Sequence, residues 1–250
     1  MELLTNGVGL SVVVFFPLIS AFIITLIPKA QEQLIKGFAL VSSLITFVLS
    51  AVLLFQFDFS SADKLQLGNK ISWIKSINAN YEIGIDGISL PLLVLSTFIT
   101  VLAIIYSIEH LPEPKSPKGF LALILVLETG MNGTFVALDL ILFFVFFEIV
   151  LLPMYFMIGI WGDKTVRTVS GFKNQIETRL YASIKFFVFT LFGSAFMLLG
   201  FLGLYYRGNK TFSIPELIEL GTSGAFTGTF ATLVFAVLFL GFAVKVPMWP

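Results

Sequence analysis

The sequence contains no cysteine and a single histidine, His110, among its 250 residues. Without a thiol, this chain forms no disulfide, offers no cysteine ligand to an iron–sulfur cluster and performs no thiol chemistry. A single imidazole also excludes a metal or haem site built from several histidines. Charged residues make up only 12% of the chain, about half of their share in soluble domains. Because the net charge is zero, no basic surface favours nucleic acid as a partner.

Apolar residues are abundant instead, at 57% of the chain, and the mean hydropathy is +0.98. Several apolar runs approach or exceed the roughly 20 residues that an α-helix needs to cross a bilayer. The composition therefore predicts an all-α, polytopic membrane protein, a bundle of about seven transmembrane helices in contact with lipid. The expected helices cover residues 10–27, 34–57, 88–108, 118–138, 138–162, 181–206 and 226–245.

One long polar segment, residues 58–87, separates the second and third helices and is expected to be an interfacial loop with strand-like sequence at 70–77. The links after the odd-numbered helices are richer in basic residues than the even ones, which by the positive-inside rule predicts an N-terminus outside the cytoplasm. The basic residues in the odd links are Lys29, Lys36, Lys115, Lys118, Lys164, Arg167, Lys173 and Arg179. Those in the even links are Lys64, Lys70, Lys75, Arg207 and Lys210.

The fifth run carries a carboxylate, Glu148, near its middle. Inserting an acid at that depth costs about 2.5–3.5 kcal/mol or more. Pro153 follows five residues later, has no N–H and crowds the carbonyl of Ile149, so we expect a kink beside the acid. The acid, the freed carbonyl and the kink indicate a hydrated ion or proton site. The alternative is a protonated glutamate that holds the helix bundle together by hydrogen bonds.

A second acid, Glu128, lies about 15 Å before the turn between the fourth and fifth helices, and Glu148 lies about 15 Å after it. The two acids are therefore expected at similar depth, and if they face each other they can share a proton. The sequence does not fix the rotation of the helices. The alternative for Glu128 is a protonated acid in an interface that also contains Gly130 and Gly133.

Two lysines fall inside or at the end of apolar helices. Lys185 lies about 9 Å beyond Arg179 along the sixth helix and either extends back to the membrane surface or points inward. Lys245 ends the seventh helix, with Pro247 directly after it. That arrangement suits an ordinary helix C-terminus with a dipole-matching cation. It equally suits a membrane helix broken at mid-bilayer, as in transporters.

Four segments carry a family resemblance: YEIGIDGISLPL, ALDLILFFVFFEIVLLPMYFMIGIWG, SIKFFVFTLFGSAFMLLG and GFAVKVPMWP. They resemble the antiporter-like membrane subunit M, or subunit 4, of proton-translocating NADH-quinone oxidoreductase, respiratory complex I. By that resemblance Glu148 and Lys245 form a charge pair in a proton path, and Lys185 matches a lysine of weaker role. The family fold consists of two inverted repeats. The resemblance covers the first half, so we expect residues 1–117 to form three N-terminal helices and 118–250 an incomplete first repeat.

The resemblance implies that this chain couples electron transfer in other subunits to proton movement through a buried Glu/Lys pathway, with no redox or catalytic centre of its own. NADH, FMN, iron–sulfur clusters and quinone are expected in those partner subunits, and the location is expected to be a bacterial inner membrane. A subunit of a multi-subunit cation/proton antiporter or of a membrane-bound hydrogenase is the nearest alternative. A structural membrane scaffold without pumping activity is an alternative of another class.

Overall fold

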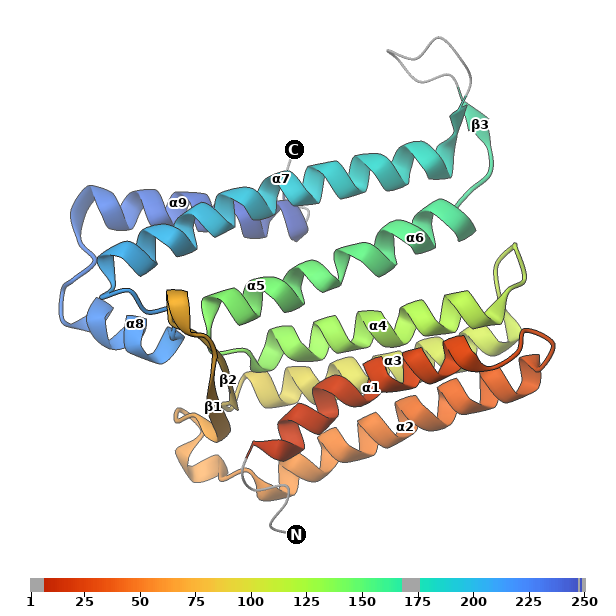
Figure 1. Cartoon of the computed structure of the whole chain (residues 1–250), viewed down its shortest axis with the longest axis horizontal. Helices are drawn as coiled ribbons and strands as arrows, with labels where there is room; N and C mark the ends of the chain where they lie inside the picture. Colours follow the sequence, from red (N-terminus) through yellow and green to blue (C-terminus); the bar gives the residue numbers. More distant parts are fainter. Residues whose placement is uncertain (1–6, 168–175, 247, 249–250) are drawn as a thin grey trace.

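The computed structural model describes residues 7–167, 176–246 and 248, and shows long helices lying side by side in a bundle (Figure 1). Seven spans in the described residues are long and apolar enough to cross a membrane, as the sequence predicts. The fifth of them consists of two consecutive helices, α5 and α6. The helices are α1 (Val8–Leu26), α2 (Glu32–Gln56), α3 (Ser89–Glu109), α4 (Pro117–Val136), α5 (Leu140–Ile149), α6 (Leu151–Trp161), α7 (Thr178–Arg207), α8 (Ile214–Thr222) and α9 (Gly228–Lys245). The chain is an integral membrane protein.

The first four helices form one group, in which α4 packs against α1, α2 and α3. α1 contains Pro17, which has no N–H to donate to the carbonyl of Val13 one turn earlier. Asn132 of α4 takes that place, because its side-chain Nδ2 donates to the Val13 oxygen at 3.4 Å. A proline inside a membrane helix is therefore accommodated by a polar neighbour on the next helix.

The second group contains α5, α6, α7 and α9, and α7 packs along both α6 and α9. The fifth membrane span is interrupted at Val150, three residues before Pro153. The sequence predicts a kink in this turn; α5 ends and α6 begins there, and the dihedral angles of Val150 stay helical. Pro247, the other predicted break, lies outside the described residues.

The connections at one end of the bundle are joined by a two-stranded antiparallel sheet and by α8 (Figure 1), and we call this the hairpin end. Strands β1 (Gln66–Ile74) and β2 (Ala79–Ile85) pair with Gln66 opposite Ile85, so the strand-like sequence at 70–77 belongs to a longer hairpin. Beside it, Lys70 bridges Glu82 at 3.2 Å and Glu216 of α8 at 2.8 Å. The Lys70 ammonium lowers the pKa of the Glu216 carboxyl, and a hydrogen bond from Thr211 adds to the effect.

Asp139 ties the hairpin to the start of α5. Its buried carboxylate accepts hydrogen bonds from the backbone N–H groups of Asn80 in β2 and of Ile141 and Leu142 in the first turn of α5. Burial raises the pKa of this carboxyl, while the three N–H groups act in the opposite direction. The sequence predicts helix up to residue 138, but Leu138 is extended, because its N–H donates to the Glu82 carbonyl and its own carbonyl accepts from Ile214.

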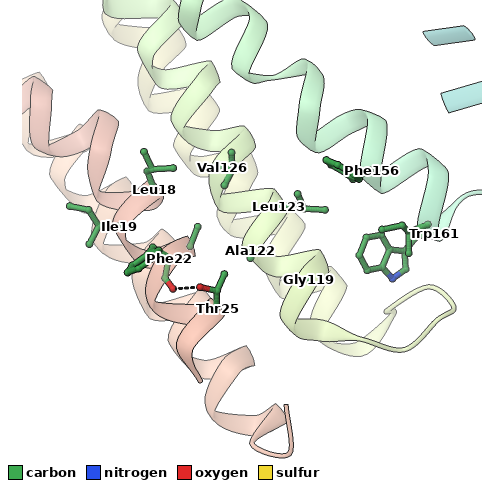
Figure 2. Close-up of a pocket in the computed structure, with 12 residues that line it drawn as sticks. Leu18, Ile19, Phe22, Thr25, Gly119, Ala122, Leu123, Val126, Phe156 and Trp161 are labelled. Carbon is green, nitrogen blue, oxygen red and sulfur yellow. Dashed lines mark hydrogen bonds between the residues drawn. The ribbon is translucent and has the colours of Figure 1, made fainter. Parts of the chain in front are cut away.

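The opposite end holds the links after α1, α3 and α6, including the two-residue strands β3 (Val166–Arg167) and β4 (Ile176–Glu177). The basic odd-numbered links thus share one end and the even-numbered links share the hairpin end. On the outer face, α1, α4 and α6 enclose a groove of about 740 Å³ (Figure 2). Apolar side chains dominate its lining, from Phe22 to Trp161, and Thr25 directs its hydroxyl to the Phe22 carbonyl. The groove is therefore a lipid-compatible surface.

Candidate functional site: a buried glutamate and lysine

Glu148 occupies the last turn of α5, directly before the interruption at Val150. It lies eight residues after the start of α5, or about 12 Å along the helix, and therefore deep in the membrane span. Its side chain is 18% exposed. A carboxylate at this depth is stabilised only by charge and hydrogen bonds from its surroundings, and two residues supply them.

The first partner is Lys245, the last residue of α9. Its Nζ lies 3.7 Å from Oε1 of Glu148 and donates a hydrogen bond of 3.1 Å to the backbone carbonyl of Phe147. The ammonium also lies 4.3 Å from the centroid of the Phe147 ring, at a distance typical of a cation–π contact. The cation stands at the C-terminus of α9, where the helix dipole favours positive charge. The ammonium is thus held by a carboxylate, a carbonyl and an aromatic face.

The second partner is Ser194 of α7. Its hydroxyl donates to Oε1 of Glu148 and also lies 3.0 Å from the carbonyl of Thr190. A hydroxyl has one proton, so it donates to one of these oxygens at a time. Beside an ionised Glu148, Ser194 donates to the carboxylate. Beside a protonated Glu148, the carboxyl donates to the serine oxygen, and Ser194 turns to Thr190. The site therefore has a hydrogen bond ready for either protonation state.

Glycines bring α9 close enough to deliver Lys245. A Cβ on Gly193 of α7 would lie 2.7 Å from Cβ of Val244, and a Cβ on Gly241 of α9 would lie 2.8 Å from Cβ of Met197. Such contacts are shorter than carbon atoms tolerate. The close approach of α7 and α9, and with it the position of Lys245, depends on the absence of side chains at these two positions.

Glu128 does not belong to this pair. Gly130 and Gly133 turn toward α5, because added Cβ atoms there would meet Val150 and Phe146. Glu128 lies about 200° around α4 from Gly130, on the face from which Asn132 reaches α1. Glu128 therefore points away from α5, the helix that carries Glu148. The two acids, which the sequence places at similar depth, do not face each other. Both carboxyl oxygens of Glu128 are buried and have no hydrogen-bond partner among the described residues.

Lys185 lies on an exposed face of α7, with its ammonium 5.6 Å from the centroid of the Tyr181 ring one turn earlier. The side chain thus extends toward the start of α7, the direction that a lysine takes when it reaches for the membrane surface. Among the described residues, Lys185 and Glu148 form no ion pair with each other. The structure also brings together no group of three His, Asp or Glu residues that could hold a metal ion in the part of the chain that it describes.

Sequence reasoning missed Ser194 and the backbone and ring of Phe147. The sequence did contain a signal for Ser194. By helical rise, Glu148 lies about 21 Å before the link at 162–179 and Ser194 about 23 Å after it, so the two residues are expected at similar depth. No sequence signal identifies the Phe147 carbonyl as the acceptor. The predicted free carbonyl was that of Ile149, two residues further along the chain.

The fold and the pair define a class: a polytopic helical membrane protein with a glutamate and a lysine paired inside the bundle. Two family models match consecutive parts of the chain. The one described as "NADH-ubiquinone oxidoreductase chain 4, amino terminus" matches residues 12–134, and the one described as "NADH:quinone oxidoreductase/Mrp antiporter, TM" matches residues 137–250. The chain belongs to the family of NADH-quinone oxidoreductase subunit M, also called chain 4.

Curated relatives agree with this assignment, and a solved structure shares the fold. NAD(P)H-quinone oxidoreductase chain 4 of Gloeobacter violaceus is 35% identical over 243 residues, covering 96% of this chain and 42% of the relative. NADH-quinone oxidoreductase subunit M of Rickettsia bellii is 35% identical over 250 residues, covering 96% and 46%. A chain of respiratory complex I from Thermus thermophilus has the same fold, with a TM-score of 0.76, 24% identity and coverage of 96% and 44%. This chain therefore spans about half the length of the relatives it matches.

Proposed function

We propose that this chain is a proton-translocating membrane subunit of NADH-quinone oxidoreductase. Other subunits, which carry NADH, FMN, iron–sulfur clusters and quinone, perform the electron transfer. The observation that carries the proposal is the pairing of Glu148 with Lys245 at 3.7 Å in an apolar membrane span. Ionisable groups at that depth are costly and usually serve transport. Family membership supplies the oxidoreductase context.

In the paired state, the Lys245 ammonium keeps Glu148 ionised, and Ser194 donates its hydroxyl proton to the carboxylate. Each charge compensates the other, so neither group gives up or takes a proton. The Phe147 carbonyl and ring also hold the ammonium.

In the separated state, charge movement elsewhere in the complex draws the two groups apart. Lys245 then has no counter-ion in an apolar setting, desolvation favours the neutral amine, and the proton moves on. Glu148 takes up a proton for the same reason, and its carboxyl donates to the Ser194 oxygen. The coupling is electrostatic and needs no redox centre in this chain.

Several further features belong to the proposal. We infer a bacterial inner membrane, an N-terminus outside, and the division into residues 1–117 and an incomplete repeat at 118–250. Lys185 and Glu128 stay predicted members of the proton route, and Pro153 and Pro247 stay predicted helix breaks. The partners are the other membrane subunits and the lipid bilayer.

Glu148→Ala tests the proposal in the purified complex reconstituted into liposomes. We expect electron transfer from NADH to quinone to continue and proton uptake to be lost. Glu219→Gln is the matched control, because Glu219 is an exposed acid of α8 far along the chain from the pair. Proton uptake at wild-type level in the Glu148→Ala complex would refute the proposal.

A serine variant separates the hydrogen bond from the charge pair. Ser194→Ala leaves Glu148 and Lys245 in place and removes one hydrogen bond to a charged group, which is worth about 1.5–3 kcal/mol. We expect proton uptake to fall at least about tenfold, and Ser194→Thr to recover most of it. Equal uptake in Ser194→Ala and wild-type complex would show that the hydroxyl has no part in translocation.

A subunit of a cation/proton antiporter is the alternative that the second family model also describes, and a membrane-bound hydrogenase subunit is related to it. The match of residues 12–134 to the oxidoreductase chain 4 model favours the first proposal. Purification of the complex decides, because NADH-oxidising or hydrogenase subunits would accompany this chain. The remaining alternative is that this chain is a structural scaffold that moves no protons itself. In that case the complex should still pump protons when both Glu148→Leu and Lys245→Leu are present.

A further inference from the structure

The interior of the α1–α4 group is divided along its length into two apolar clusters with a polar region between them. One cluster, near the hairpin end, contains Leu10 and Leu90, and the other, toward the opposite end, contains Ile35 and Leu125. The buried residues between these clusters include an acid, an amide and several hydroxyls. We call six of them the polar layer: Thr46, Ser96, Thr97, Thr100, Glu128 and Asn132.

The polar layer has fewer free hydrogen-bond donors than acceptors. Thr46, Thr97 and Thr100 each donate to a carbonyl of their own helix, so these hydroxyl protons are in use. The Asn132 Nδ2 group donates to the Val13 carbonyl. Both carboxyl oxygens of Glu128, Oδ1 of Asn132 and the Ser96 hydroxyl have no partner among the described residues. Among these six residues, three acceptor atoms and one hydroxyl donor, that of Ser96, therefore have no assigned partner.

No cation of the surrounding helices compensates an ionised Glu128. α1 carries no ionisable side chain, and Glu148 of α5 lies beyond the opposite face of α4. The nearest cation along α4, Lys118, is ten residues and about 15 Å away. A buried carboxylate without a counter-ion or donors is strongly unfavourable, whereas the neutral acid supplies one donor itself. The remaining ionisable residues of the helices around Glu128 lie in their first or last two turns: Glu32, Lys36, Tyr106 and Glu109.

We propose that the polar layer is a second proton-binding site, separate from the Glu148–Lys245 pair, in which Glu128 holds a proton and water supplies the missing hydrogen bonds. A neutral carboxyl donates once, and a water molecule donates twice, which satisfies the three acceptors. The site stands on burial and on the balance of donors and acceptors in α1–α4. It is independent of whether Glu148 and Lys245 move protons.

Infrared spectroscopy on the complex in lipid tests this site without reference to activity. At neutral pH, we expect a carbonyl-stretching band of a protonated carboxylic acid that disappears in Glu128→Gln. Because water reaches the layer, the band must shift soon after transfer into D₂O. Glu148→Gln and Glu219→Gln are the matched controls and must leave this band in place, whatever they do to proton uptake.

Two results overturn the proposal. Absence of the band from the wild-type complex means that Glu128 is ionised. A band that does not shift after a day in D₂O means that the layer is dry and that Glu128 only joins the helices. Should Glu128→Gln not assemble, Glu128→Asp keeps a carboxyl in a different position and must move the band; an unmoved band also refutes the assignment to Glu128.

Discussion

A single methyl group at Gly193 tests whether the spacing of α7 and α9 governs the charge pair. In Gly193→Ala the new Cβ meets Cβ of Val244 at 2.7 Å, whereas carbon contacts are favourable at about 3.5–4.0 Å. Because Val244 Cβ is fixed to its backbone, it cannot swing away. The two helices must therefore separate by about 1 Å, and Lys245, the next residue, moves with α9.

The cost of that movement follows from the distance between the charges. Lengthening the separation of Lys245 Nζ and Glu148 Oε1 from 3.7 Å to about 4.7 Å lowers their attraction from about 4.5 to about 3.5 kcal/mol at an effective dielectric constant of about 20. A difference of about 1 kcal/mol is about fivefold in an equilibrium. We therefore expect proton uptake per electron transferred to fall about fivefold.

Proton uptake and electron transfer would be measured together in liposomes. Gly203→Ala is the matched control, since a Cβ at that position of α7 lies 3.7 Å from Phe230 and from Val234 of α9, in ordinary contact. Adding Val244→Gly to Gly193→Ala removes the clash and should restore uptake. If both glycine variants pump alike, or if Val244→Gly gives no recovery, helix spacing does not control the pair.

Two further predictions concern stability. Asn132→Leu leaves the Val13 carbonyl without a donor and should lower the free energy of unfolding by about 1–3 kcal/mol, measured by thermal unfolding. The loss should be smaller in a Pro17→Ala background, because the alanine N–H supplies the missing hydrogen bond. An equal loss in both backgrounds contradicts this account. Because Lys70 lowers the pKa of Glu216 in the folded protein, its contribution is present at neutral pH and is lost as the pH falls through that lowered value. The melting temperatures of wild type and Glu216→Gln should therefore converge in acid, and curves that stay parallel refute the argument.

The helices were largely predictable because each apolar run is long enough to span the bilayer on its own. The predicted and observed helix ends differ where a local polar contact determines the end of the helix. The fourth helix ends at Val136 instead of residue 138, since Leu138 pairs in extended conformation with Glu82 and Asp139 begins the next helix. The hairpin at 66–85 was only partly foreseen, because its strands carry mixed charges and no regular alternation.

The site was predictable in composition and only partly in geometry. Family resemblance proposed Glu148 and Lys245 as a pair, and their contact at 3.7 Å is consistent with it. Rotation about a helix axis is a tertiary property, so residue spacing gave the depth of Glu128 and not its direction. The glycines of α4 decide that direction by packing against α5. Ser194 escaped notice because a serine in a membrane helix is common and has no charge to mark it.

At the hairpin end, Asp139 clamps the first turn of α5 to β2 and the neighbouring backbone. The first half of the fifth span is thus anchored to a rigid outer frame, and Glu148 sits on the last turn of that anchored half. Beyond Val150, whose backbone keeps helical dihedral angles, α6 begins and packs against α7 and α4. The lysine of the charge pair depends on a different support, because α9 packs along α7 and brings Lys245 to the anchored carboxylate as its final residue.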